Sequence, residues 1–338
     1  MFVVTGVTGK VGAQVAKKLL AAGLPVRAVL RDQAKAASWR ALGCEIAFAS
    51  MDDAGALATA FDDAEAVFVL LPPVFDPSAG YAETRANVAA LVAALQQARP
   101  RRVVALSTIG AQATEESLLT QLQMMERAFA ALAMPVAFLR AAWFMENAAW
   151  DIDDARSRGV VSSFLQPLDK PVPMVATADV AATAAQMLQD HWEGRWVVEL
   201  EGPVRVTPQV LAATLGRVLA RDVLAQPVPR STWETSFRSQ GMANPLPRIR
   251  MLDGFNEGWI EFEGGPGASR KGATELETVL RGLADPERAS RGPSPSRSWW
   301  RLPAGFLPAS TKAGGHVLRK PTQPHPCADR SLPRRLSQ

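Results

Sequence analysis

Short apolar runs alternate with stretches of helical periodicity along the first 150 residues of the chain. The first run, Phe2 to Val4, precedes a segment in which Val11, Val15 and Leu19 recur on one helical face. The pattern predicts strands at 2–4, 26–30, 43–49, 66–71, 102–112 (ending in a glycine turn) and 135–140, and helices at 13–22, 36–42, 54–61, 81–98 and 117–132. Strands that alternate with helices at this spacing are typical of a doubly wound parallel sheet, whose ligands bind at the carboxyl ends of the strands.

Beyond residue 150 the alternation gives way to a smaller α/β pattern. It predicts helices ending at Leu188 and Ala220, a helix from Trp233, a last helix at 274–283, and strands at 196–200 and 225–228. The aromatic residues between 255 and 262 have the spacing of a lid or pocket wall, with ordinary core packing as the alternative. We predict one folded unit in two parts, residues 1–150 and residues 151–286, followed by a tail at 287–338.

Composition defines the character of that tail. The last 51 residues, from Arg288, contain eight prolines, seven serines and ten Lys or Arg against a single acid, Asp329. Such a segment buries too little apolar surface to offset its ordering entropy, so we predict a disordered basic tail. The formal net charge of +4 comes from this tail, because the residues before it carry 27 bases and 32 acids. We therefore expect no nucleic-acid partner.

The remaining composition excludes several other classes of protein. No apolar run reaches the roughly 18 residues of a membrane span, and the N-terminus lacks the pattern of a signal peptide. We expect a cytoplasmic protein without a membrane partner. Because Cys44 and Cys327 lie far apart and the chain has three histidines, we expect neither a disulfide framework nor a metal site.

The first candidate site follows the first strand. Gly6, Gly9 and Gly12 form a G-x-x-G-x-x-G turn, one residue longer at its front than the usual G-x-G-x-x-G dinucleotide motif. A helix N-terminus attracts anions, and a turn without side chains lets a diphosphate approach the backbone. The alternative is an ordinary strand-to-helix turn with a glycine that packs against the helix. We predict dinucleotide contacts at Gly6, Thr8, Gly9, Lys10, Val11 and Gly12.

The end of the second strand bears on which dinucleotide binds. A carboxylate there usually receives the ribose hydroxyl of NAD, whereas NADP requires a cation for its 2′-phosphate. Arg31 follows the strand directly and Lys35 lies one turn further on, so we predict NADP(H) in preference to NAD(H). Asp32 would repel the phosphate if its carboxylate turned inward. The alternative is that both cations are merely solvated.

Asp52 follows the third strand, whose loop passes the adenine in this architecture. We therefore consider Asp52 a candidate for binding the adenine amino group. The alternative is that it only caps the helix at 54–61, as Asp and Asn residues commonly do.

Together these features resemble the NmrA-like branch of the atypical short-chain dehydrogenases. The likeness covers residues 1–283 and rests on segments 5–12, 31–35, 106–111, 144–147 and 174–181. This branch includes NAD(P)H-dependent quinone reductases, triphenylmethane-dye and azo-dye reductases, and nucleotide-sensing regulators. The resemblance implies a Rossmann-like domain that binds NADP(H), with the substrate in a cleft beside the smaller C-terminal part.

The catalytic pair of ordinary short-chain dehydrogenases is missing. Those enzymes use Tyr-x-x-x-Lys, in which the lysine lowers the pKa of the tyrosine that relays a proton. Here Tyr81 is the single tyrosine, and Arg85 stands four residues after it; Leu122 occupies a position where relatives often have Lys or His. We predict reduction of an acceptor that needs little acid help, such as a quinone or an electron-poor dye.

Further candidate residues follow the predicted strand ends and the aromatic segment. We expect further cofactor contacts at Leu71, Pro72, Ser107 and Thr108, and substrate contacts at Val74, Trp143, Phe144 and Asn147. Thr108 and Asn147 are the candidates for a hydrogen bond to a substrate oxygen, with a purely structural role as the alternative. The expected partner is a small conjugated acceptor, and a homodimer is one option for assembly. A non-catalytic sensor of NADP(H) is the rival function, and a sugar-nucleotide epimerase is disfavoured by the missing proton-transfer pair.

Overall fold

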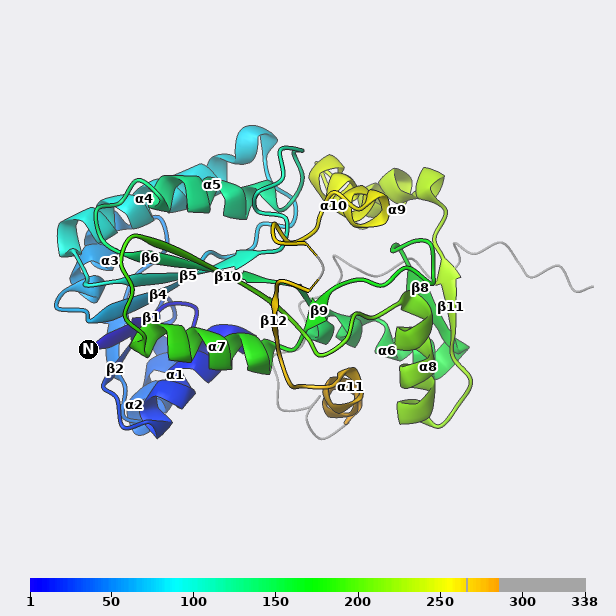
Figure 1. Cartoon of the computed structure of the whole chain (residues 1–338), viewed down its shortest axis with the longest axis horizontal. Helices are drawn as coiled ribbons and strands as arrows, with labels where there is room; N and C mark the ends of the chain where they lie inside the picture. Colours follow the sequence, from blue (N-terminus) through cyan, green and yellow to red (C-terminus); the bar gives the residue numbers. More distant parts are fainter. Residues whose placement is uncertain (266, 286–338) are drawn as a thin grey trace, which may run out of the picture. The chain divides into compact units, whose positions relative to one another are not determined.

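A parallel sheet organises the computed structural model, which describes residues 1–265 and 267–285. Within these residues, eight strands pair in the order β12-β10-β6-β5-β4-β1-β2-β3 (Figure 1). They are β1 (Phe2–Val4), β2 (Val26–Leu30), β3 (Glu45–Phe48), β4 (Ala66–Leu70), β5 (Val103–Thr108), β6 (Val136–Ala141), β10 (Arg195–Glu201) and β12 (Arg270–Lys271). All neighbouring pairs are parallel, so the carboxyl ends of these strands meet at one edge of the sheet.

Helices cover both faces of this sheet (Figure 1). One face carries α1 (Lys10–Ala21), α2 (Ala36–Ala41) and α7 (Thr177–Gln189), and the other carries α3 (Ala54–Phe61), α4 (Ala82–Ala98) and α5 (Thr120–Phe129). Short 3₁₀ turns lie between them at η1 (Gln33–Lys35) and η2 (Ala79–Tyr81). Since both faces are covered, the strands are nearly continuous apolar runs.

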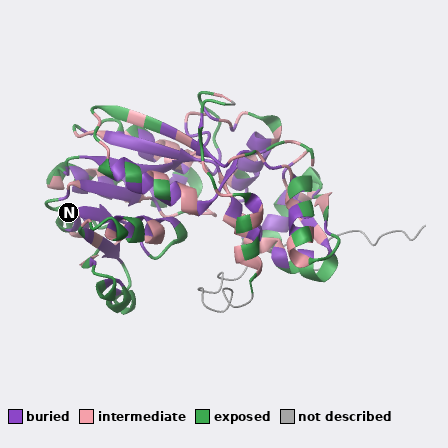
Figure 2. Ribbon diagram, turned by 60° about the horizontal axis from the view of Figure 1, so that its bottom comes forward, coloured by how far each residue is buried: buried purple, intermediate pink, exposed green. Residues whose placement is uncertain are grey.

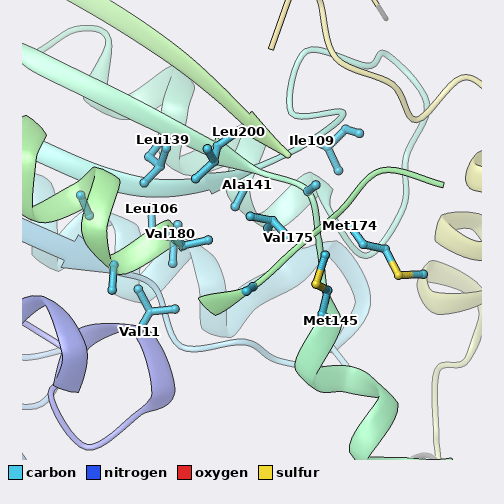
Figure 3. Close-up of a cluster of buried hydrophobic side chains, with 14 of the residues drawn as sticks. Val11, Leu106, Ile109, Leu139, Ala141, Met145, Met174, Val175, Val180 and Leu200 are labelled. Carbon is cyan, nitrogen blue, oxygen red and sulfur yellow. The ribbon is translucent and has the colours of Figure 1, made fainter. Parts of the chain in front are cut away.

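Alternate strand residues feed two separate hydrophobic clusters. Val4, Phe68 and Leu106 belong to the cluster beneath α1 and α7, whereas Val3 and Val67 belong to the cluster beneath α3, α4 and α5. In the first cluster, the side chains of Leu106, Leu139 and Leu200 lie near Val11 and Val180 (Figure 3). Figure 2 shows the resulting pattern, with buried residues along the strands and exposed residues on the outer helix surfaces.

The rest of the described chain lies beyond the carboxyl edge of the sheet. It contains two short parallel pairs, β7 (Trp143–Phe144) with β9 (Met174–Val175) and β8 (Val160–Ser163) with β11 (Leu224–Pro227). The helices are η3 (Met145–Trp150), α6 (Ile152–Arg158), α8 (Pro208–Leu219), η4 (Arg230–Thr232), α9 (Trp233–Ser239), α10 (Leu246–Glu257) and α11 (Leu276–Ala284).

The predicted doubly wound, Rossmann-like parallel sheet is confirmed, with local differences. Helix α5 is shorter than the expected 117–132. The last helix begins at Leu276, not Thr274, because the N–H and hydroxyl of Thr274 both donate to Asp179. Helix α10 was not expected, and Phe255 is buried within it. The predicted tail lies outside the described residues.

The sheet continues past the boundary proposed at residue 150. Strand β10 pairs with β6 along six residues, β12 pairs with β10, and α7 packs beside α1. The last third of the described chain therefore supplies two strands to the same sheet. The division into residues 1–150 and 151–286 stays a prediction about separate roles.

The hydroxyl of Thr5 gives a test of how β1 is fixed to β4. Its Oγ1 donates to the Phe68 carbonyl at 3.1 Å and accepts from the Leu70 N–H at 2.9 Å, in a fully buried position. We expect Thr5→Val to lower the free energy of unfolding by about 1–3 kcal/mol, because it leaves a buried N–H without its partner. Urea denaturation measures this loss. Thr59→Val, on the exposed side of α3, should change it by less than about 0.5 kcal/mol; equal losses would contradict the assignment.

Candidate functional site

Each of the three glycines in the turn after β1 meets a different structural requirement. Gly6 has φ +65°, a conformation that L side chains rarely adopt. A Cβ on Gly12 would lie 2.4 Å from the Gly6 carbonyl oxygen, so a glycine there is required for α1 to pack against the turn. A Cβ on Gly9 would meet the Gly6 oxygen at 3.3 Å, with no other heavy atom of the described residues within 4 Å. Apart from this one close contact with the Gly6 oxygen, the space in front of the Gly9 backbone is open.

The start of α1 suits an anion. Its N-cap is Gly9, no described side chain caps it, and its first turn contains no acidic residue. By contrast, the Asp53 side chain caps α3 and the Thr207 side chain caps α8. Thr8, Gly9 and Lys10 are exposed. Uncapped N–H groups behind a turn without side chains form the cradle that a dinucleotide diphosphate requires, so the residues present fit such a cofactor.

The end of β2 presents cations. Arg31 and Lys35 are exposed there, and the Asp32 carboxylate accepts the Ala34 N–H at 2.9 Å. Asp32 thus caps the turn η1. This bond gives the Asp32 carboxylate a local partner within its own turn.

Asp52 lies close to the same region. A hydrogen bond from Ser50 lowers the pKa of its carboxyl, and the positive charge of Arg31 lowers it further. Helix α3 is capped by Asp53, whose carboxylate accepts the Ala56 N–H, so capping does not explain Asp52.

The end of β5 presents two hydroxyls in different surroundings. Ser107 Oγ donates to Glu126 at 2.5 Å, and Glu126 also holds Arg140 with bonds of 3.0 and 2.8 Å. Although burial opposes it, these bonds and a bond to Glu263 raise the pKa of the Arg140 guanidinium. Ser107 is thus engaged in a buried ionic group. Thr108, the next residue along β5, points to the opposite face and is half-buried.

The loop after β4 carries Leu71, Pro72 and Val74. Leu71 is buried, and the other two are half-buried. Gln121, on α5, donates to the Val74 carbonyl at 3.0 Å and accepts from Thr84 at 2.8 Å. Gln121 therefore fixes the position of this loop. Sequence reasoning missed it, because a lone glutamine on a helix carries no recognisable signal.

The hydroxyl of the single tyrosine, Tyr81, is hydrogen-bonded to the backbone and not directed to a substrate. Tyr81 Oη donates to the Ser117 carbonyl at 2.8 Å, and burial raises the pKa of Tyr81 to about 12. The side chain of Leu122 packs on the hydrophobic cluster beneath α3, α4 and α5. Neither residue can give a proton to a substrate at neutral pH.

The aromatic segment after β6 reaches the edge of the sheet next to these loops. The rings of Trp143 and Phe255 form a T-shaped pair, with centroids 5.3 Å apart. The Glu146 carboxylate accepts the Thr177 N–H at 2.9 Å and the Thr177 hydroxyl at 2.5 Å, which anchors the segment to the start of α7. Phe144 and Asn147 are half-buried.

Burial raises the pKa of Asp151, four residues after Asn147, to about 7, and the charge of Asp154 adds to this effect. The carboxyl is therefore partly protonated near neutral pH.

The topology gathers the predicted residues at one edge. The glycine turn follows β1, Arg31 follows β2, Leu71 follows β4, Thr108 ends β5 and Trp143 follows β6. Because these strands are adjacent and parallel, their ends are neighbours. Ser107 is the member of the predicted set whose hydroxyl already has a buried partner.

Residues 1–265 and 267–285 contain no cluster of three or more His, Cys, Asp or Glu placed to hold a metal ion. They also contain no helix with the length and apolar character that crossing a membrane requires.

Comparison with known proteins gives matches over most of the chain. A family model described as NAD(P)H-binding matches residues 6–191. A (4-alkanoyl-5-oxo-2,5-dihydrofuran-3-yl)methyl phosphate reductase of Streptomyces griseus is 33% identical over 224 residues, which are 65% of this chain and 74% of the relative. An NAD(P)H azoreductase of Xenophilus azovorans is 27% identical over 253 residues, 73% of this chain and 83% of the relative.

A solved structure gives the same fold. The NADPH-dependent quinone oxidoreductase of Escherichia coli, complexed with NADPH, superposes with a TM-score of 0.70 over 84% of this chain and 100% of that one. Their sequences are 22% identical, so this similarity establishes the fold alone.

Substitutions at Gly12 and Gly9 should have different effects, because Gly12 is needed for packing of α1 and Gly9 for binding of the cofactor. We expect Gly12→Ala to destabilise the protein by about 1–3 kcal/mol, because its methyl group would overlap the Gly6 carbonyl. Gly9→Val should cost less stability than Gly12→Ala, since Gly9 has extended backbone angles that valine adopts and its Cβ would meet the Gly6 oxygen at 3.3 Å, not 2.4 Å, but it should weaken NADPH binding at least about tenfold. Thermal unfolding and calorimetric titration measure the two effects.

Gly55→Ala, in the exposed part of α3, is the matched control for a glycine within a helix. It should raise stability by about 0.5–1 kcal/mol. The assignment fails if Gly9→Val binds NADPH as tightly as the wild type does.

Proposed function

Because this chain belongs to the NAD(P)H-binding family, we propose that it is an NADPH-dependent reductase of conjugated acceptors, with quinones and azo compounds as the leading classes. The observation that carries the proposal is the uncapped start of α1 behind Gly9, where the backbone can receive a diphosphate.

The relatives support the reductase activity. Two of them are named as reductases, one for azo compounds and one for a furanone phosphate, and a structural neighbour is a quinone oxidoreductase. These named acceptors contain conjugated double bonds. An acceptor of this kind takes up a hydride without a strong acid from the protein. This agrees with Tyr81, whose hydroxyl already donates to the Ser117 carbonyl.

Each part of the site has a separate task in this proposal. The bound cofactor would supply a hydride. The amides at the start of α1 hold the diphosphate, Arg31 and Lys35 face the 2′-phosphate, and Asp52 receives the adenine amino group.

The remaining predicted residues hold the two reactants together. Leu71 and Pro72 lie beside the nicotinamide site, and Val74, Trp143 and Phe144 exclude water from the acceptor. Asn147 or Thr108 donates a hydrogen bond to an acceptor oxygen. The protein thus contributes position and a dry surface to the reaction.

A second candidate function is sensing of the cofactor without turnover. Two observations favour it: the Tyr81 hydroxyl donates to the Ser117 carbonyl, and the half-buried Leu122 side chain packs against the cluster beneath α3, α4 and α5. In that case the chain would bind NADP(H) and pass the state of the cofactor to another protein.

One assay distinguishes the two candidates. A reductase should oxidise NADPH only when a quinone or azo dye is added, and Gly9→Val should abolish this activity. The loss of NADPH absorbance measures it. Micromolar binding of NADPH without turnover on a panel of quinones and azo dyes would favour the sensor, and absence of binding would reject both candidates.

The cofactor preference is tested at Arg31. We expect Arg31→Ala to weaken NADPH binding by about 10- to 100-fold, because it removes one charge-assisted hydrogen bond to the 2′-phosphate. NADH binding should change little, so the preference for NADPH would shrink. Arg40→Ala, an exposed arginine on α2, serves as the control in the same titrations. Equal weakening of both cofactors would contradict this role for Arg31.

A further inference from the structure

Asp76 joins two parts of the chain that are far apart in sequence. It lies in the loop after β4, and its carboxylate accepts the N–H of Ala243 at 2.8 Å and the N–H of Asn244 at 2.7 Å. The Asn244 side-chain amide donates to the Pro77 carbonyl at 2.9 Å. Three hydrogen bonds therefore hold the segment between α9 and α10 against the loop after β4.

These bonds fix the segment that leads into α10. The helix begins at Leu246, no described side chain caps it, and its first turn contains no acidic residue. A carboxylate is favoured near a helix N-terminus, and hydrogen bonds to a charged acceptor are stronger than those to a neutral one. Asp76 therefore anchors the start of α10 from a distant loop.

The start of α10 and the loop after β4 are also joined through α5. Leu118, just ahead of α5, donates its N–H to the Pro247 carbonyl at 2.8 Å. Gln121 of α5 donates from Nε2 to the carbonyls of Leu118 and Val74, both at 3.0 Å. Val74 and the first turn of α10 thus belong to one hydrogen-bonded unit, to which Asp76 contributes a charged anchor.

The other end of α10 packs against the proposed acceptor site. Phe255, in the last turn of α10, is 4% exposed, and its ring forms a T-shaped pair with the ring of Trp143. Because backbone hydrogen bonds keep a helix of 12 residues, about 18 Å long, in one shape, a displacement of its start also displaces Phe255. Asp76 and Trp143 are thus connected through α10.

We propose that Asp76 is a positioning residue of the acceptor site. By holding the start of α10 against the loop after β4, it sets the distance between Val74 and Trp143, the side chains predicted to contact the acceptor. Asp76 itself contacts neither reactant. A site already shaped for its ligand loses less entropy on binding, so Asp76 acts on the affinity for the acceptor. This inference rests on the proposed reductase function and extends the site to a residue outside it.

The test measures the acceptor and the cofactor separately in Asp76→Ala. With 1,4-naphthoquinone as the acceptor, KM should rise about 5- to 20-fold, whereas kcat and the dissociation constant of NADPH should stay within about twofold of the wild-type values. The cofactor is spared because the glycine turn and Arg31 follow β1 and β2, and the bonds of Asp76 run to the segment before α10. Asp76→Asn keeps one acceptor oxygen and should give a smaller rise in KM.

Arg102→Met controls for a general loss of stability. Arg102 is buried directly before β5, at the opposite edge of the sheet, where it donates to the Leu188 carbonyl at 3.2 Å and to Glu65 at 2.9 Å. Both variants should lower the melting temperature, because each removes hydrogen bonds. Only Asp76→Ala should raise KM for the quinone. An equal rise in both variants would assign the effect to stability and overturn the proposal.

Hydrogen exchange follows the position of α10 without any acceptor. In Asp76→Ala the amides of residues 246–257 and 143–147 should exchange faster than in the wild type, whereas those of residues 10–21 should exchange at the same rate. Unchanged exchange over residues 246–257 would contradict the proposal, because Asp76 would then not hold the helix.

The remaining outcomes separate this inference from the reductase function. Turnover of the quinone with the same KM in Asp76→Ala and the wild type rejects the positioning role and leaves the reductase in place. Calorimetric titration of the quinone with NADP⁺ present covers the case of binding without turnover: weaker binding by Asp76→Ala then supports the positioning role and rejects the reductase. A quinone that is neither bound nor reduced rejects both.

Discussion

The contact between α1 and the end of β1 is the constraint on which the candidate site depends. The helix lies so close to the turn that a single methyl group on Gly12 would overlap the Gly6 carbonyl. The buried Thr5 hydroxyl fixes the end of the strand to β4 on the other side. Because the turn is fixed from both sides, the uncapped amides of α1 are held in place before any ligand arrives, which lowers the entropy lost on binding.

Carboxylates around this edge act as structural partners. Glu146 holds the start of α7, Asp179 holds Thr274 ahead of α11, and Glu126 holds Arg140 and Ser107. Each of these three carboxylates satisfies donors that are buried or half-buried. Glu146, Asp179 and Glu126 therefore position the surrounding segments, and hydride chemistry remains with the cofactor in the proposed mechanism.

Helices α9 and α10 contain both paired and unpaired polar groups on their buried sides. The Asp253 carboxylate of α10 forms a bidentate pair with Arg230, at 2.6 and 2.8 Å. On the buried face of α9, Ser236 and Gln240 lack such partners within the described residues.

The sequence by itself determined the parallel sheet, the glycine turn and the cations after β2. These features depend on neighbours along the chain: runs of apolar residues buried on both faces, glycines three residues apart, and a charge directly after a strand. The tertiary structure alone decided that β10 extends the first sheet, that Gln121 holds Val74, and that Ser107 bonds to Glu126. The tertiary structure also decided that residues 246–257 form helix α10. The apolar pattern of this segment is broken by Arg248 and Asp253, both of which are buried. The partners in these contacts lie many residues apart, so no local periodicity records them; they exist only once the chain has packed.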